Sequence, residues 1–325
     1  MEVIKVENLK KVYRIPKRRE GFLNTFKDLI KHEYEDKTAL ADISFSINEG
    51  DIVGYIGPNG AGKSTTIKIM AGILYPTSGQ VTVNEVIPYK EKVRNAKEIS
   101  LIAGNRSNLY WDLPIIDTFE LMKRIYKISD KKYKQNLDLL SEVIGIKDLH
   151  TVPARQLSLG QRMRADFVAS MLHDPKIVYL DEPTIGLDIV AKDHIREFIK
   201  TVNSEKRTTV IITSHDIADI ERICNRVIVI DYGKIIYSGN IDNLNSEYNN
   251  NKCIMKIKLE DKAESFNLEG FDVKQVNDMY SISFERKKIT PSGMLNLLLE
   301  KGYKIIDFSL TEPSLEDTIK AIYEK

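Results

Sequence analysis

Cysteine and long apolar runs are both scarce in this chain. Its two cysteines, Cys224 and Cys253, lie on separate predicted elements. This excludes a disulfide framework and a cysteine-based metal site, and it favours reduced thiols in a reducing compartment. No apolar run approaches the roughly 20 residues that a membrane-spanning helix needs, and residues 1–5 do not begin a secretory signal. We therefore expect the chain to stay in the cytosol.

An excess of charge of one sign is also missing. The 48 lysines and arginines are balanced by 47 aspartates and glutamates, which leaves a net charge of +1. This argues against a nucleic-acid binder that relies on a strongly basic surface, although a local basic patch stays open. With 42% hydrophobic and 29% charged residues over 325 positions, the composition indicates a folded chain that is long enough for two domains.

One stretch has the pattern G-x-x-x-x-G-K-[ST]. It is Gly57-Pro58-Asn59-Gly60-Ala61-Gly62-Lys63-Ser64-Thr65. An apolar run over residues 51–56 predicts a buried strand before it, and residues 65–72 predict a helix after it. The glycines allow backbone N–H groups to converge on a polyphosphate at the start of the helix. A glycine-rich turn without a ligand is disfavoured by this strand-loop-helix setting, so the stretch indicates nucleoside triphosphate binding.

Two side chains of this stretch have expected roles in such a site. We expect Lys63 to reach the β- and γ-phosphates and Ser64 to hold a magnesium ion through its hydroxyl.

Strands and helices alternate along much of the chain. Apolar runs over residues 177–180, 209–212 and 227–230 predict buried strands, with a helix over about 190–203 between the first two. This alternation predicts a parallel sheet that is covered on both faces. Helical periodicity between residues 113 and 150 interrupts the pattern.

The N-terminal part predicts two strands separated by an insertion. The strands cover residues 2–13 and 38–48, and residues 16–37 are the insertion, with an amphipathic helix over about 20–35. The chain is basic around the start of this insertion, with Lys10, Lys11, Arg14, Lys17, Arg18 and Arg19. A basic start beside an apolar stripe suits anionic head groups or a partner's groove, and a helix packed on its own domain is the alternative.

A small α+β domain is predicted over residues 241–325. Residues 241–251 indicate a polar linker, and strands are expected at 253–259, 280–284 and 304–310, with helices at 291–301 and 314–323. We find no catalytic constellation in this part.

Four further stretches follow in an informative order. They are residues 157–161, 177–183, 186–188 and 213–216. Asp181 ends a predicted parallel strand, so it should lie beside the phosphate loop, where it can accept waters of the magnesium shell. Glu182 would then orient and deprotonate the attacking water, and His215 would donate to the γ-phosphate.

This order of motifs resembles the ATPase subunits of ABC transporters, over residues 2–240. The resemblance implies a P-loop α/β fold with an antiparallel β subdomain and a helical subdomain at about 105–165. It also implies a head-to-tail dimer, with ATP between the phosphate loop of one copy and the signature, residues 157–161, of the other. It assigns catalysis to Lys63, Glu182 and His215, and magnesium to Ser64, Asp181 and Asn105. The residues implied to bind ATP are Tyr13, Gly57, Pro58, Asn59, Gly60, Ala61, Gly62, Lys63, Ser64, Thr65, Asn105, Ser158, Gly160, Gln161, Asp188 and His215.

At three positions the family pattern is changed or another interpretation stays open. Tyr13 matches the aromatic residue that stacks on adenine, and a surface strand tyrosine is the alternative. Leu159 replaces the first glycine of the usual signature, which places the local loop packing in doubt. Asn105 stands where the family has a glutamine, and its shorter amide can act through a bridging water. The alternative is that Asn105 only turns the chain after a strand.

The function that follows is an ATP-hydrolysing subunit that uses ATP and Mg²⁺ and powers a separate transmembrane permease. The similarity of residues 104–114 to ABC-2-type ATPases favours an exporter at the cytoplasmic face of the cell membrane. The expected partners are that permease and a second copy of the chain, with no nucleic acid. The alternatives are an ABC ATPase that remodels a nucleic-acid or protein complex, and a regulatory nucleotide-binding module, which the presence of Glu182 disfavours.

Overall fold

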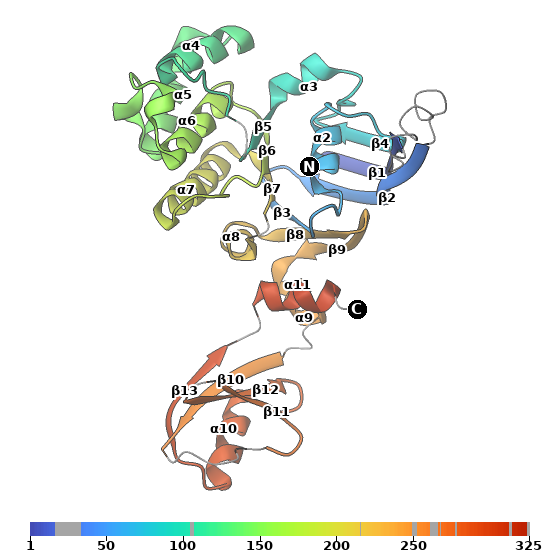
Figure 1. Cartoon of the computed structure of the whole chain (residues 1–325), viewed down its shortest axis with the longest axis vertical. Coiled ribbons are helices and arrows are strands. Elements are labelled where there is room, and N and C mark those ends of the chain that lie inside the picture. Colours follow the sequence, from blue (N-terminus) through green and yellow to red (C-terminus); the bar gives the residue numbers. More distant parts are fainter. Residues whose placement is uncertain are drawn as a thin grey trace, which may run out of the picture. The chain divides into compact units, whose positions relative to one another are not determined.

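The structure is a computed structural model of the whole chain. It describes residues 1–16, 34–104, 107–214, 216–248, 252–260, 266, 268–276, 278–311 and 314–323. Contacts between Cα atoms divide the chain into two units, Met1–Ser238 and Gly239–Lys325 (Figure 1). Each unit has a hydrophobic core of its own.

A six-stranded sheet runs through the larger unit in the order β5-β6-β7-β3-β8-β9. The strands are β3 (Ile52–Ile56), β5 (Ile99–Ala103), β6 (Ile177–Asp181), β7 (Thr209–Thr213), β8 (Arg226–Asp231) and β9 (Lys234–Asn240). The first five of these pair in parallel. Every residue of β3 and β7 is buried, as expected for the central strands of a sheet covered on both faces. The predicted parallel sheet is therefore confirmed.

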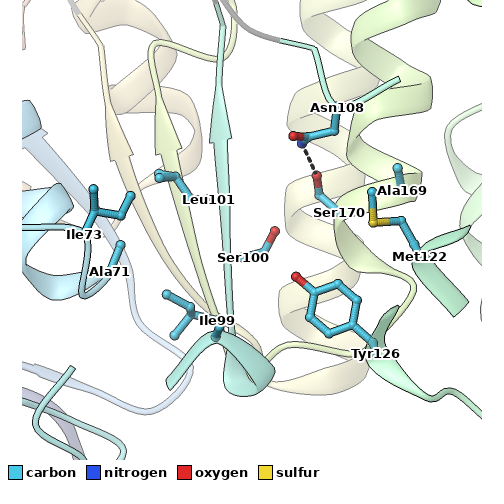
Figure 2. Close-up of a pocket in the computed structure, with 11 residues that line it drawn as sticks. Ala71, Ile73, Ile99, Ser100, Leu101, Asn108, Met122, Tyr126, Ala169 and Ser170 are labelled. Atoms are coloured by element: carbon cyan, nitrogen blue, oxygen red, sulfur yellow. Dashed lines mark hydrogen bonds between the residues drawn. The ribbon is translucent and has the colours of Figure 1, made fainter. Parts of the chain in front are cut away.

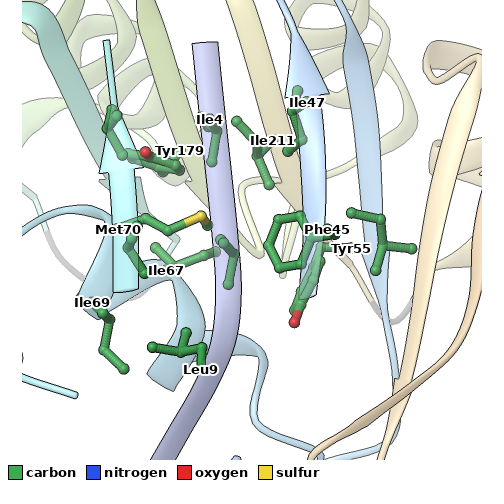
Figure 3. Packing of buried hydrophobic residues seen from close by; sticks show 14 of the residues in the cluster. Ile4, Leu9, Phe45, Ile47, Tyr55, Ile67, Ile69, Met70, Tyr179 and Ile211 are labelled. Carbon is green, nitrogen blue, oxygen red and sulfur yellow. The ribbon is translucent and has the colours of Figure 1, made fainter. Parts of the chain in front are cut away.

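A second, antiparallel sheet has the order β2-β1-β4. Its strands are β1 (Glu2–Pro16), β2 (Tyr34–Asn48) and β4 (Ser78–Val83). Their apolar side chains form one cluster with helix α2 (Lys63–Met70) and the central sheet (Figure 3). Phe45 of β2 lies against Tyr55 of β3, with ring centroids 5.9 Å apart. This cluster supports α2, which begins at Lys63.

The predicted boundaries of the N-terminal insertion are wrong. β1 continues to Pro16 and β2 already begins at Tyr34, and these two residues are paired. The predicted helix over 20–35 is therefore wrong at residues 34 and 35, while its remaining part up to residue 33 lies outside the described residues. Residues 34–37 are exposed and have no alternating apolar pattern. Pairing with the backbone of β1 holds them as a strand.

Helices cover the central sheet and form a separate group beside it (Figure 1). This group is α4 (Ile115–Tyr126), α5 (Asp130–Val143) and α6 (Leu159–Met171), which contact one another. The other helices in the described part of this unit, besides α2, are α3 (Lys92–Glu98), α7 (Ile189–Lys206) and α8 (Ile217–Ile223). Single 3₁₀ turns lie at Lys147–Leu149 and Ala154–Gln156. In the part of the chain that the structure describes, no helix combines the length and apolarity needed to cross a membrane.

The smaller unit contains an antiparallel sheet with the order β11-β12-β10-β13. Its strands are β10 (Lys252–Leu259), β11 (Asp272–Val276), β12 (Met279–Glu285) and β13 (Ile305–Thr311). Helix α10 (Pro291–Glu300) contributes the buried Met294 and Leu298 to the core of this sheet. Two further helices, α9 (Ile241–Tyr248) and α11 (Leu315–Tyr323), contact each other.

The predicted polar linker over 241–251 is wrong for its first eight residues. They form α9, in which Ile241 and Leu244 are buried. The two lie three positions apart, on one helical face, and α9 packs with α11. Tertiary packing thus stabilises a helix whose remaining residues are mostly polar. Strand β11 was not predicted either.

Candidate functional site

The predicted phosphate-binding stretch, residues 57–65, forms a tight loop between β3 and the start of α2. Gly60 and Gly62 have φ values of +86° and +112°, a region that disfavours other residues. A Cβ atom on Gly62 would lie 2.7 Å from the carbonyl oxygen of Ala39. A Cβ atom on Gly57 would overlap the carbonyl oxygen of Ile230. The sequence therefore needs glycine here for both conformation and space. The resulting loop leads into the N-terminus of α2, where backbone N–H groups favour anions.

Lys63 is the first residue of α2 and is only 7% exposed. Its Nζ donates to the carbonyl oxygens of Gly57, at 2.6 Å, and Pro58, at 3.1 Å. Burial lowers the pKa of Lys63, while the charges of Glu182 and Asp181 oppose this shift. The ammonium group thus lies over the loop, facing two carboxylates. Within the same stretch Ala61 is buried, Ser64 and Thr65 are half-buried, and Pro58, Asn59 and Gly60 are exposed.

Asp181 lies at the end of β6, beside the start of α2. Its Oδ1 accepts hydrogen bonds from Thr213 Oγ1 at 2.6 Å and from Ser64 Oγ at 3.4 Å. Thr213 ends β7, so the carboxyl ends of two parallel strands meet here, where open α/β sheets bind ligands. A hydroxyl next to a carboxylate supplies the oxygen donors that Mg²⁺ prefers. Ser64 and Asp181 therefore fit the metal that the sequence predicts.

The backbone of Glu182 is fixed from two sides. It has a left-handed φ of +53°, which is unusual for a residue with a side chain. Its N–H donates to the carbonyl oxygen and to Oγ1 of Thr213, at 3.0 and 3.1 Å. On the other side, Gly104 lies so close that a Cβ atom on it would overlap the carbonyl oxygen of Glu182. The backbone of Glu182 is thus held between the end of β7 and the chain that directly follows β5.

A second group of predicted residues lies at the starts of α6 and α7. Ser158 caps α6, with Ser158 Oγ accepting from Gln161 N at 3.2 Å and Gln161 Oε1 accepting from Ser158 N at 2.9 Å. Asp188 caps α7 by accepting from Ala191 N at 2.7 Å. A Cβ atom on Gly160 would lie 3.0 Å from that of Ala191, so the two helix starts approach closely. Leu159, the unusual signature residue, is exposed.

Of three other predicted site residues, the structure describes only Tyr13. Tyr13 is half-buried on β1, and the ammonium group of Lys11 lies 5.1 Å from the centroid of its ring. Asn105 and His215 lie outside the described residues. Their roles therefore stay predictions.

The sequence reasoning missed three residues that organise the site. They are Thr213 and Gly104, described above, and Asp166 on α6. Asp166 is buried, its Oδ1 accepts from Asn108 N at 2.7 Å, and burial raises its pKa to about 6. Asp166 thereby attaches the chain that follows residues 104–106 to α6. An acidic residue directly before the apolar stretch Phe167-Val168-Ala169 was the available signal.

A cavity of about 240 Å³ lies between the end of α2, β5, α4 and α6 (Figure 2). Its apolar lining includes Ile73, Leu101, Met122 and Tyr126. Asn108 also lines it and donates to Ser170 Oγ at 3.3 Å. Gly104, which packs against Glu182, and Asn108, which lines this cavity, are four positions apart in the sequence.

A phosphate loop between β3 and α2, with two carboxylates at the end of β6, defines a P-loop nucleoside triphosphatase. The profile of the family described as ABC transporter matches residues 40–185. The linearmycin resistance ATP-binding protein LnrL of Bacillus subtilis is 31% identical over 295 residues, which are 88% of this chain and 94% of LnrL. The chain therefore belongs to the ABC transporter ATP-binding proteins, and it is an ATPase. The predicted family and activity are confirmed.

Other relatives agree with this assignment. The bacitracin transport ATP-binding protein BcrA of Bacillus licheniformis is 28% identical, over 87% of this chain and 92% of BcrA. The solved structure of cbiO1 from Clostridium perfringens, part of the ABC transporter complex cbiONQ, has a TM-score of 0.63. It is 25% identical, and the match covers 76% of this chain and 91% of cbiO1. The predicted fold class is confirmed.

Proposed function

We propose that two copies of the chain bind ATP head to tail and hydrolyse it to drive an exporter-type permease at the cytoplasmic face of the membrane. The fixed Asp181–Glu182 pair beside the phosphate loop is the observation on which this depends. The signature group at the start of α6 is the complementary half of such a site, supplied by the other copy. LnrL and BcrA, named for linearmycin resistance and bacitracin transport, support the exporter direction.

The geometry suits in-line attack of water on the γ-phosphate. The loop N–H groups and the start of α2 hold the phosphates, and Lys63 stabilises charge on the γ-phosphate oxygens. Ser64 and Asp181 would hold Mg²⁺, which neutralises phosphate charge when bound. Glu182 takes the proton of the attacking water as the bond from phosphorus to the β-γ bridging oxygen breaks. His215 donates a hydrogen bond to the γ-phosphate, and Tyr13 stacks on adenine.

The cavity near Asn108 is the proposed contact site for the permease. Its apolar lining suits a short cytoplasmic segment of a membrane protein. Gly104 packs against the backbone of Glu182, and Asn108, four positions later in the sequence, lines the cavity. Occupation of the cavity would thus act on Glu182 through the chain between Gly104 and Asn108, which contains Asn105.

Replacement of Glu182 by glutamine tests the proposed chemistry. Glu182→Gln keeps the shape and the hydrogen-bonding capacity of the side chain but removes the base, so turnover should fall by about 10²- to 10⁴-fold. ATP binding should persist, and the variant should accumulate as an ATP-bound dimer in size-exclusion chromatography. Glu197→Gln, at an exposed position of α7, is the matched control and should hydrolyse ATP like the parent. Turnover of Glu182→Gln within threefold of the parent would remove Glu182 from the role of base.

A further inference from the structure

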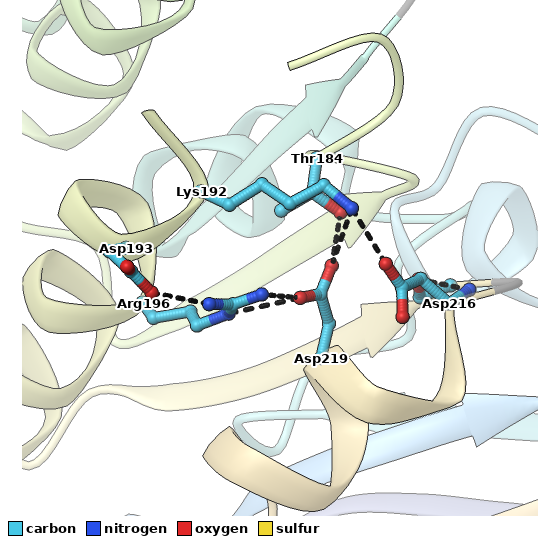
Figure 4. Close-up of polar contacts among 7 residues, drawn as sticks. Thr184, Lys192, Asp193, Arg196, Asp216 and Asp219 are labelled. Carbon is cyan, nitrogen blue, oxygen red and sulfur yellow. Dashed lines mark hydrogen bonds and ion pairs between the residues drawn. The ribbon is translucent and has the colours of Figure 1, made fainter. Parts of the chain in front are cut away.

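A network of charged side chains joins α7, α8 and the turn after β6 (Figure 4). The buried Asp219 of α8 accepts a hydrogen bond from Thr184 Oγ1 at 2.7 Å and is paired with Arg196 of α7. Lys192 Nζ lies 2.6 Å from Asp216 Oδ2 and 3.8 Å from Asp219 Oδ2. The hydrogen bond from Lys192 lowers the pKa of the Asp216 carboxyl.

Each part of this network adjoins a segment of the proposed hydrolytic site. Thr184 lies two residues after Glu182, and Asp216 directly follows position 215. The N–H of Lys192 donates to the carbonyl oxygen of Asp188 at 3.0 Å. Lys192 therefore connects Asp188 with Asp216, through the first turn of α7 on one side and an ion pair on the other.

The network costs desolvation, because it places the carboxylate of Asp219 and most of Arg196 away from water. Ion pairs of this kind frequently add no net stability compared with apolar residues of the same size, so stability alone does not account for them. Their directional bonds instead fix the relative positions of the segments that they join. Here these segments are the start of α7, the turn after Glu182 and the chain beside position 215.

We propose that Lys192 and Asp219 are positioning residues for ATP hydrolysis. They hold Asp188, the turn after Glu182 and the chain at Asp216 as one unit, so that arrival of the second copy at Asp188 aligns the groups that attack the γ-phosphate. The inference rests on the proposed dimeric site.

Steady-state kinetics of Lys192→Met test this role. Arg196 and Thr184 stay in place, so Asp219 keeps partners while the link to Asp216 is lost. We expect kcat to fall at least tenfold while KM for ATP stays within about twofold, because alignment rather than binding is damaged. Lys192→Arg keeps the charge and should restore kcat to within threefold of the parent. Lys200→Met, an exposed change on the same helix, should leave both constants unchanged.

Several results would overturn this inference. Unchanged kcat in Lys192→Met would do so, as would a rise in KM alone or a failure of Lys192→Arg to restore turnover. If Lys192→Met does not fold, Asp216→Asn removes the same ion pair from the other side and should show the same loss of kcat. Glu182→Gln distinguishes a failure of the proposed function from a failure of the positioning role. Normal turnover in that variant defeats the proposed function, whereas normal turnover in Lys192→Met alone defeats only the positioning role.

An independent observation concerns β13, an edge strand of the smaller unit. Within the described residues it pairs with β10 on one side only. Its alternate residues Ile306, Phe308 and Leu310 are 60%, 49% and 36% exposed. An exposed apolar edge strand of this kind is a template for pairing with another strand.

The strand is complementary to itself in antiparallel pairing. Phe308 is the middle residue of Ile305–Thr311. A twofold axis at Phe308 places Ile306 opposite Leu310 of the second copy. It also places Asp307, the charged residue of the strand, opposite Ser309, so no like charges meet. The apolar stripes of the two copies then lie side by side, so that each buries part of the other.

We infer that β13 pairs with β13 of a second copy of this chain and joins two sheets into one. Disulfide trapping in the full-length protein tests the register, since Cys224 and Cys253 are buried. Phe308→Cys places the two thiols at directly opposed positions, close enough to form a disulfide under mild oxidation. Ile306→Cys and Leu310→Cys should not cross-link alone, but a mixture of these two variants should. Absence of the Phe308→Cys dimer, or equal cross-linking of all three single variants, would overturn the inference.

Discussion

Gly104 illustrates how a residue without a side chain can constrain the backbone of Glu182, the proposed catalytic base. A Cβ atom at this position would overlap the carbonyl oxygen of Glu182 and lie 2.9 Å from a side-chain carbon of Ile185. Because backbone cannot rotate away as a side chain can, Gly104→Ala should displace Glu182. A misplacement of about 1 Å can reduce turnover by roughly 10²-fold. We therefore expect a loss of kcat in ATPase assays, with a smaller effect on ATP binding measured by titration calorimetry.

Gly293→Ala is the matched control for this change. The added Cβ atom would lie 3.1 Å from the side chains of Ile289 and Thr290, both within the smaller unit. It should leave turnover unchanged. Equal kinetics for Gly104→Ala and the parent would show that Glu182 tolerates displacement at this point.

Asp166 predicts a pH dependence of stability. Its pKa is raised to about 6 by burial, opposed by hydrogen bonds that include the one from Asn108 N. The folded state therefore favours the protonated acid, and the stability that this group contributes is present below its unfolded pKa and is lost as pH rises towards 6 and beyond. Between pH 5 and 7.5 the loss is on the order of 1 kcal/mol.

Asp166→Asn removes this titration and keeps an oxygen that can accept from Asn108. Urea unfolding of the parent and the variant at pH 5 and 7.5 measures the effect. The parent should lose more free energy of unfolding across this interval than the variant does. Identical changes in both proteins would show that Asp166 does not titrate in this range.

The site residues that could be predicted from the sequence have their partners close by in the chain, whereas the residues that were missed have partners far away in the chain. The phosphate loop is recognisable because its function depends on neighbours within nine positions, and Asp181 because it directly follows an apolar strand. Thr213, Gly104 and Asp166 act across sheets and loops. Their partners are 32, 78 and 58 positions away in the sequence, so no local pattern marks them.

At the scale of elements, the hairpin of β1 and β2 makes the segment between them replaceable. Pro16 and Tyr34 are paired in antiparallel register, which is the position that a two-residue turn closes. Replacing residues 17–33 with Asn-Gly should therefore preserve the fold. ATP turnover within twofold of the parent and an unchanged melting temperature are the expected results. Loss of either would show that residues 17–33 stabilise the ATPase unit.

Two elements show why the rest of the fold was harder to predict. Helix α9 has apolar residues at helical spacing, but asparagine and serine around them are typical of linkers, and packing with α11 decides the outcome. Residues 34–37 have no strand pattern and are held by pairing with β1. The buried strands of the central sheet, by contrast, were predictable because burial on both faces requires continuous apolar runs.

At the scale of the whole molecule, the two units have separate cores. A chain that ends at Asn240 keeps β9 complete and retains every described residue of the proposed catalytic site. It should therefore fold and hydrolyse ATP, with a maximal turnover within about threefold of the parent. Circular dichroism and ATPase assays at high protein concentration measure both properties.

The concentration dependence of hydrolysis should nevertheless change. If two copies also pair through β13, the first contact raises the effective concentration for the second, and losing it weakens dimerisation without altering the site itself. The chain that ends at Asn240 should need at least about tenfold more protein to reach half of its maximal specific activity. Phe308→Glu in the full-length chain should reproduce this shift, because opposed like charges at the twofold axis repel. If the activity curves of the parent, the shortened chain and Phe308→Glu superimpose, the smaller unit does not assist dimerisation. If the shortened chain is inactive at every concentration, the smaller unit is needed for catalysis.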